Sequence, residues 1–239
     1  MATFDSAIGY IQKAEGGLSR AVTDSASANP SPYVVNGVSG WHTNRGITWG
    51  TFQQMAPIVG YSVNQDNFIN MPDWIWLGIY KQGYWNPIHG DDYNSQPIAN
   101  AVVDFAWGSG VGGATKQVAK FLAQNGVSGG NAAQNAQGMN QLVVNNGENK
   151  TFNDFIDFRK QFFVGLNQPA NQKGWLSRMD TLRTQGLSLI TEGIQEVAQT
   201  VEATATETGQ LVKQNVWIQG GITLLFIFSL NFIYNRLKK

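Results

Sequence analysis

The sequence predicts a mainly helical globular body, followed by a helical stalk and a single transmembrane helix. Three observations predict this organisation. Apolar residues recur at helical spacing in several segments of residues 1–185. A heptad-like apolar stripe then runs from Leu187 to Leu211, and residues 216–234 contain no charged side chain. These patterns suit a packed core, an exposed helix and a lipid bilayer, respectively.

The body is long enough to form a core, because 42% of the 239 residues are hydrophobic. We expect core helices over residues 95–106, 114–124 and 151–166, whose aromatic side chains are interpreted as packing residues. Residues 128–147 are rich in Gly, Asn, Gln and Ala and are interpreted as a surface excursion.

Composition excludes several classes of function. The chain has no cysteine and two histidines, His42 and His89, so we expect no metal site and no cofactor, and interpret both histidines as loop or packing residues. Before residue 216 the chain carries 16 acidic and 13 basic side chains, which argues against nucleic acid as a partner. Residues 1–13 lack the pattern of a conventional signal peptide, so export would use another route.

The charge-free run of residues 216–234 has 19 residues, which at about 1.5 Å per residue nearly spans a bilayer core of about 30 Å. Trp217 and Tyr234 lie near its ends, and the last four residues include Arg236, Lys238 and Lys239. Because basic flanks stay inside, the body is expected on the outer, periplasmic side of a cytoplasmic membrane or on a virion membrane. A buried core helix is the alternative.

The stripe from Leu187 to Leu211 recurs in steps of three and four residues and predicts a helical stalk. Threonines weaken its second half, at Thr204 and Thr208. Self-association through this stalk is therefore a hypothesis, with a monomeric spacer as the alternative.

Glu15 is the sharpest functional lead in the chain. Phe4, Ile8 and Ile11 form an apolar stripe, and the next step along it is Glu15, followed by Gly16 and Gly17. A carboxyl that is partly buried at a helix end has a raised pKa and can stay protonated as a general acid. The alternative is a glutamate that turns outward or pairs with an arginine.

Five short motifs in order resemble glycoside hydrolase family 108, the phage and bacterial N-acetylmuramidases with an attached peptidoglycan-binding segment. The similarity covers about residues 4–183, and the motifs are Glu15-Gly16-Gly17, Thr43-Asn44-Arg45-Gly46-Ile47-Thr48, Tyr84-Trp85, Asp104-Phe105-Ala106 and Gly174-Trp175-Leu176-Ser177-Arg178. The resemblance implies an α+β, lysozyme-like fold and hydrolysis of the β-1,4 bond between N-acetylmuramic acid and N-acetylglucosamine in peptidoglycan. It also implies that Glu15 is the catalytic acid.

A second catalytic group must stabilise the transition state or position water. Asp24 is the candidate carboxylate, with a turn or capping role as its alternative. Thr43 and Thr48 are candidates to hold the attacking water, although either hydroxyl could make only a structural hydrogen bond.

Aromatic and polar side chains suit a saccharide groove, because sugars present both C–H faces and hydroxyls. Arg178 could meet a muramyl or peptide carboxylate, or could instead form a structural salt bridge. Trp74 and Trp76 are interpreted as core residues. The candidate substrate-binding residues are Trp41, Asn44, Tyr84, Trp85, Trp107 and Arg178, with Trp49 as a further candidate wall.

The resemblance suggests a muramidase part over residues 1–110 and a helical peptidoglycan-binding part over 111–185. Outside the resemblance, the sequence patterns predict the stalk over 186–214, the transmembrane helix over 215–235 and a basic tail over 236–239. Two departures from the family pattern are the long Leu18–His42 loop, which puts the equivalence of Asp24 in doubt, and Gly108, where the family tends to have asparagine.

The leading hypothesis is a membrane-tethered muramidase, used by a phage in lysis or when a virion enters or leaves a cell. The alternatives are a structural membrane protein of a virion that binds glycan without cutting it, and a lytic transglycosylase.

Overall fold

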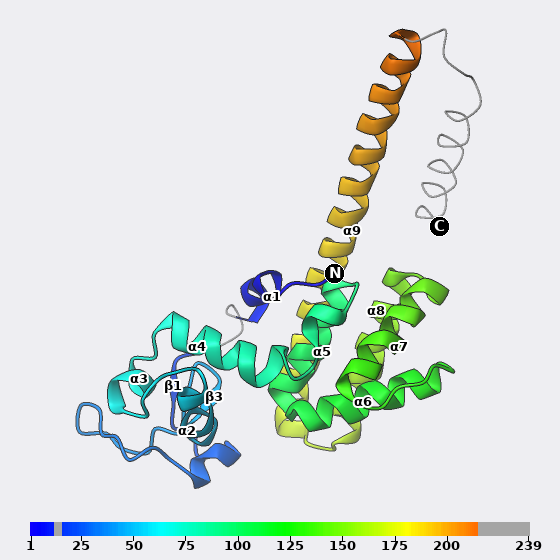
Figure 1. Ribbon diagram of the computed structural model, residues 1–239. Helices are drawn as coiled ribbons and strands as arrows, with labels where there is room; N and C mark the ends of the chain where they lie inside the picture. The colour runs from blue at the N-terminus through cyan, green and yellow to red at the C-terminus, as the bar shows by residue number, and fades with distance from the viewer. Residues whose placement is uncertain (12–15, 215–239) are drawn as a thin grey trace. The chain divides into compact units, whose positions relative to one another are not determined.

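The computed structural model describes residues 1–11 and 16–214 (Figure 1). Glu15, the predicted transmembrane helix over residues 215–235 and the basic tail over 236–239 lie outside the described residues. Within residues 1–11 and 16–214, no helix has both the length and the apolar character that a membrane crossing requires. The chain divides into two compact units, residues 1–186 and residues 187–239.

The first unit is mainly helical with one small sheet, which confirms the predicted mainly helical body. Its helices and strands follow in the order α1 (Phe4–Ile11), β1 (Leu18–Ser19), η1 (Ser25–Ala28), β2 (Thr43–Asn44), β3 (Ile47–Thr48), α2 (Trp49–Ile58), α3 (Gln65–Ile69), α4 (Asp73–Tyr80), η2 (Lys81–Trp85), η3 (Gly90–Asp92), α5 (Gln96–Ser109), α6 (Val111–Gln124), α7 (Ala132–Asn146) and α8 (Glu148–Gly165), and it ends within α9 (Pro169–Gln214).

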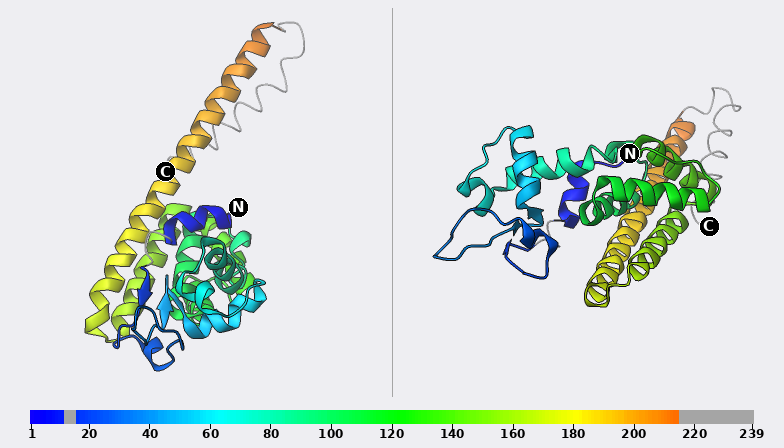
Figure 2. Two further views of the ribbon diagram at one scale, coloured as in Figure 1. Left: turned by 90° about the vertical axis from the view of Figure 1, so that its left-hand side faces the viewer. Right: turned by 90° about the horizontal axis from the view of Figure 1, so that it is seen from below.

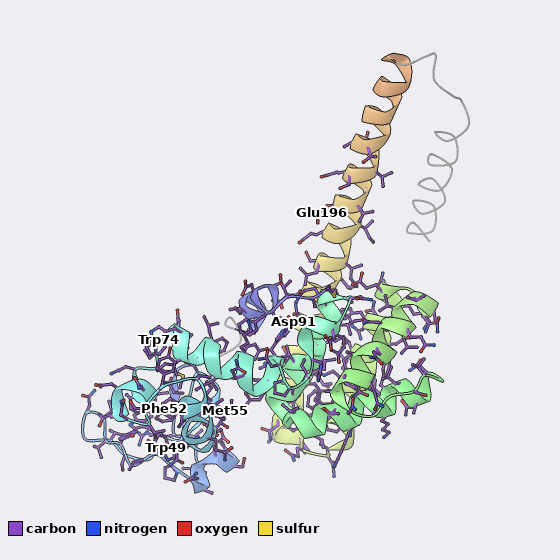
Figure 3. The ribbon with its side chains drawn as sticks, in the orientation of Figure 1. Trp49, Phe52, Met55, Trp74, Asp91 and Glu196 are labelled. Carbon is purple, nitrogen blue, oxygen red and sulfur yellow. The ribbon has the colours of Figure 1, made fainter. Side chains whose placement is uncertain are left out.

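The sheet, α2 and α3 gather at one end of this unit and form what we call the small lobe (Figures 1 and 2). Strands β2 and β3 are joined by the two residues Arg45 and Gly46, whose φ angles of 50° and 76° are both positive, as a tight hairpin turn with matching strand twist requires. The rings of Trp49, Phe52 and Phe68 pack together with centroids 5.0–5.9 Å apart and form the core of this lobe. Figure 3 labels Trp49 and Phe52.

Helix α4 connects the small lobe to a second core. Trp76 and Tyr80 stack with centroids 5.3 Å apart and are completely buried, so the predicted core position of Trp76 is confirmed. The same prediction is wrong for Trp74, which is 50% exposed and packs on Tyr61 (Figure 3). The reason is that Trp74 and Trp76 are two residues apart, so one helix cannot direct both side chains to the same face.

The large lobe consists of α5 to α8 and the part of α9 that ends at Gly186. The predicted helices of residues 95–106, 114–124 and 151–166 correspond to α5, α6 and α8. Phenylalanines from these helices pack together, including Phe105 on Phe162 and Phe121 on Phe155, each pair with centroids 5.1 Å apart. These contacts confirm the interpretation of the aromatic side chains as core.

Residues 128–147 are not the expected surface excursion. Residues 132–146 form α7, which packs between α6 and α8 and buries Ala136, Met139 and Leu142. A Cβ on Gly138 would lie 2.7 Å from the Ser128 carbonyl oxygen and 2.8 Å from Leu122. The small residues that suggested a loop therefore allow close approach of a helix to its neighbours.

The described part of the second unit is the remainder of α9, residues 187–214. It is helical, as predicted for the stalk, and Ile194 and Val197 of the predicted stripe are exposed. Self-association through this stripe remains a prediction.

Candidate active site

Three hydroxyl side chains form a row across the small sheet. In the antiparallel register, Ser19 is opposite Thr43, and Thr43 is opposite Thr48. Residues directly opposite each other in neighbouring strands project on the same face, with Cβ atoms about 5 Å apart. The other face carries the row Leu18, Asn44 and Ile47, of which Asn44 and Ile47 are buried against the core of the small lobe. The sequence pointed to both threonines but not to Ser19, because only strand pairing brings that residue into the row.

Thr43 is held by its neighbour His42. The Thr43 hydroxyl lies 2.9 Å from His42 Nδ1, and His42 Nε2 lies 3.2 Å from the Ala21 carbonyl oxygen. The backbone of His42 is also fixed on both sides, because its N–H donates to Ser19 and its carbonyl accepts from Trp49. His42 is completely buried, which agrees with the expected packing role but adds a specific contact to a candidate catalytic residue.

Thr48 has a different local role, since it is the N-cap of α2. Its hydroxyl oxygen accepts a hydrogen bond from the Thr51 N–H at 3.2 Å and lies 3.0 Å from the Thr51 hydroxyl. Capping of this kind satisfies one of the free N–H groups of the first helical turn. The structural alternative considered for the threonines is thus present at Thr48.

Asp24 lies in the loop between β1 and β2 and caps the short helix η1. Its Oδ1 accepts from the Ala26 N–H at 2.9 Å, and the side chain is exposed. Its own N–H donates to the Ala21 carbonyl oxygen at 2.9 Å, the same oxygen that faces His42 Nε2. The structure places Asp24 in a capping geometry and links its turn to Thr43 through His42.

Asn44 and Trp85 lie in the core rather than on a surface that a substrate could reach. The Asn44 amide donates to the carbonyl oxygens of Phe68 and Ile69 at 2.6 and 3.0 Å. Trp85 is completely buried, its Nε1 donates to Asp91, and a Cβ on Gly90 would come within 2.2 Å of its ring. Trp49, the further candidate wall, is also buried in the core of the small lobe.

Tyr84 and Trp107 are brought together, although they are 23 positions apart in the sequence. Their rings are half-buried and lie 4.7 Å apart at an angle of 56°. Trp41, also half-buried, donates from Nε1 to the Val38 carbonyl oxygen, and the Arg20 guanidinium lies 5.7 Å above its ring. Of the candidate walls, Tyr84, Trp107 and Trp41 therefore keep accessible ring surface.

Arg178 takes part in a buried ionic cluster. Its Nε donates to Asp104 Oδ1 at 2.7 Å, and Arg159 donates to Asp104 Oδ2 at 2.7 Å. The side chain of Asp104 is 1% exposed, whereas that of Arg178 is 30% exposed. The cluster borders a cavity of about 160 Å³ whose lining also includes Gly108, Ser109, Phe163 and Trp175. The structural salt bridge considered for Arg178 is present, and its side chain still reaches this cavity.

Glu15 is outside the described residues, but its sequence neighbourhood leads directly into the sheet. The Gly17 carbonyl oxygen accepts from the Arg45 N–H at 3.3 Å, and β1 begins at the next residue. Thr43 and Thr48 therefore belong to the same small sheet as the strand that follows Glu15-Gly16-Gly17.

The described part of the chain contains no group of three or more His, Asp or Glu that could hold a metal ion.

The chain resembles known proteins both in sequence and in fold. Residues 8–110 match the sequence model of the family described as glycosyl hydrolase 108. The structure of SagA from Brucella abortus is similar over 77% of this chain and 94% of that protein, with a TM-score of 0.56 and 26% sequence identity. No curated protein matches the chain in sequence. The sequence match supports a glycoside hydrolase, and its range includes the three strands of the small sheet.

Proposed function

We propose that this chain is a glycoside hydrolase that cleaves the β-1,4 bond between N-acetylmuramic acid and N-acetylglucosamine of peptidoglycan. The observation that carries the proposal is the row of Ser19, Thr43 and Thr48 on the sheet that begins directly after Glu15-Gly16-Gly17. The match of residues 8–110 to glycosyl hydrolase 108 supports the same reaction class.

In the inverting form of this reaction, an acid lies on one side of the glycosidic bond and a positioned water on the other. Glu15 is the proposed acid. Gly17, two residues later in the sequence, accepts a hydrogen bond from the Arg45 N–H of the hairpin turn. The Glu15 proton goes to the leaving glycosidic oxygen as its bond to the anomeric carbon breaks.

The hydroxyl row is proposed to hold the attacking water. The water oxygen forms the new bond to the anomeric carbon, and its proton passes to a carboxylate, for which Asp24 is the candidate. A positioned water also favours hydrolysis over the transglycosylase alternative, in which a hydroxyl of the sugar itself attacks. Half-buried Tyr84 and Trp107 are proposed to contact the apolar sugar faces.

Substitution of the acid tests the proposal. Glu15→Gln should reduce release of muramic-acid reducing ends by about 10²- to 10⁴-fold, because the amide cannot donate the proton with a carboxyl's acidity. Glu196→Gln, on exposed α9, is the matched control and should leave the rate unchanged. Full activity of the Glu15→Gln protein would contradict the assignment.

The products separate the alternatives. Mass spectrometry of the released fragments should show a reducing N-acetylmuramic acid end, whereas an anhydro-muramic end would indicate a transglycosylase. Tight binding of peptidoglycan by the wild-type chain with no new ends would indicate a glycan-binding structural protein.

We further propose that residues 216–234 tether the enzyme to a membrane, with the body on the outer side. The charge-free run and the basic residues after it support this proposal. A tether would restrict cleavage to the wall near that membrane, as suits phage lysis or a virion component. The stalk would set the distance from the membrane, alone or as a self-associated helix.

A further inference from the structure

The hydrogen bonds of His42 determine which way the Thr43 hydroxyl points. A carbonyl oxygen can only accept, so His42 Nε2, 3.2 Å from the Ala21 oxygen, must carry its proton. In the neutral imidazole the other nitrogen, Nδ1, is then an acceptor. Because Nδ1 lies 2.9 Å from the Thr43 hydroxyl, Thr43 donates its proton to His42.

This orientation leaves the lone pairs of the Thr43 oxygen as acceptors. A water that donates a hydrogen bond to Thr43 keeps its own lone pair for attack on carbon. If Thr43 instead donated to the water, that hydrogen bond would use one of the two lone pairs of the water oxygen and make it a weaker nucleophile. Thr48 is less suited to this role, since its oxygen already accepts from the Thr51 N–H as the cap of α2.

We propose that His42 is a positioning residue that holds the Thr43 hydroxyl as the hydrogen-bond acceptor for the attacking water. The inference rests on the proposed function, since the water is the nucleophile of that hydrolysis. His42 is suited to the role because it is buried and its backbone is held between Ser19 and Trp49. The imidazole therefore has a fixed position relative to the face that carries the hydroxyl row.

Two substitutions of His42 distinguish its hydrogen bond with Thr43 from its hydrogen bond with Ala21. The Asn amide oxygen is attached at Cγ, as Nδ1 is, so His42→Asn can keep an acceptor for the Thr43 hydroxyl. The Gln amide lies one carbon further out, near the position of Nε2, so His42→Gln can keep the donor to Ala21 and lose the acceptor. If His42 acts through Thr43, the Gln variant should lose about tenfold in the rate of peptidoglycan cleavage, and the Asn variant should stay within about threefold of wild type.

The role of Thr43 is tested in the same assay. Thr43→Val removes the hydroxyl at nearly constant shape and should lose at least as much activity as His42→Gln. In the Thr43→Val background, His42→Gln should cause no further loss, because the two residues act as one unit. Urea unfolding of each variant accompanies the kinetics, so that a loss of fold is recognised separately.

Nuclear magnetic resonance tests the direction of the hydrogen bond between Thr43 and His42 independently of an activity measurement. The full chain has two histidines, so ¹⁵N-histidine labelling produces two ring spectra. At mildly alkaline pH, His42 should be the Nε2–H tautomer with Nδ1 unprotonated, and only its Nδ1 resonance should shift in Thr43→Val. His89 is the internal contrast, because its Nδ1 lies 2.9 Å from the Asp92 carboxylate and should carry a proton.

The outcomes are distinguishable. An Nδ1–H tautomer at His42, or equal activities of the Asn and Gln variants in a cleaving enzyme, would overturn the inference and leave the proposed function standing. A wild-type chain that does not cleave peptidoglycan would overturn the proposed function, and with it the role of the water. Three results together would support both the inference and the proposed function. The His42→Gln variant loses cleavage activity, the His42→Asn variant keeps it, and His42→Gln causes no further loss in the Thr43→Val background.

Discussion

At the scale of single residues, Asp104 is a buried carboxylate that forms ion pairs with two arginines. It accepts from Arg159 of α8 and Arg178 of α9, each at 2.7 Å. Asp104 belongs to α5, so one side chain connects three helices of the large lobe. Removal of one partner from a buried ion pair leaves the other charge buried without compensation. The resulting loss of stability is larger than the net stabilisation that the intact pair provides.

Asp104→Asn should therefore lower the free energy of unfolding by about 3–5 kcal/mol. Asp154→Asn is the matched control, because Asp154 accepts from Lys150 one turn away in an exposed part of α8 and such pairs contribute about 0.3–0.5 kcal/mol. Urea titration of the full chain, followed by tryptophan fluorescence, measures both. Equal losses in the two variants would show that burial of Asp104 does not govern its contribution.

Some residues of the candidate site are predictable from the sequence and others are not, because the contacts of a side chain depend on the fold. The family motifs selected Thr43, Tyr84 and Arg178, and the preference of sugars for aromatic surfaces selected Trp107; all four keep some exposed surface. It could not show that Asn44 turns inward, since its amide partners Phe68 and Ile69 are more than 20 residues away. It also treated His42 as packing, because a buried histidine reveals its hydrogen-bond partners only in three dimensions.

At the scale of elements, helix periodicity was a better guide than composition. The apolar spacing correctly predicted α5, α6 and α8, whose buried stripes follow the period of a helix. Composition misled at residues 128–147, because Gly and Ala are shared by loops and by closely packed helices. A capping box, formed by Asn131 and Gln134, was the available local signal for α7.

Two glycines of α9 should respond in opposite ways to replacement by alanine. A Cβ on Gly186 would lie 2.1 Å from the Phe152 ring, whereas a Cβ on Gly174 meets no atom within 4 Å. Gly186→Ala should destabilise the protein by about 1–3 kcal/mol through overpacking. Gly174→Ala should stabilise it by about 0.5–1 kcal/mol, because glycine weakens a helix interior. Thermal unfolding of both variants measures the signs, and a stabilised Gly186→Ala protein would contradict the close packing of α9 on Phe152.

At the scale of the whole molecule, the distribution of charge predicts an orientation. All 16 acidic side chains precede residue 216, and three of the last four residues are basic. If the proposed membrane segment lies between them, the basic residues that follow it favour the inner side, and the body is then on the outer side. The proposed substrate, a cell-wall polymer, lies on that same outer side.

Single cysteines can test this orientation, because the natural chain has none. In bacterial spheroplasts that express the full chain, a membrane-impermeant maleimide should label Gln54→Cys, on the exposed surface of α2, and should not label Lys239→Cys until the membrane is opened. Leu225→Arg combined with Phe228→Arg is the control for insertion, since each charge near the centre of the span costs about 2.5–3.5 kcal/mol. That variant should leave the membrane fraction, and labelling of Lys239→Cys in intact spheroplasts would show that the tail is outside and the proposed orientation is wrong.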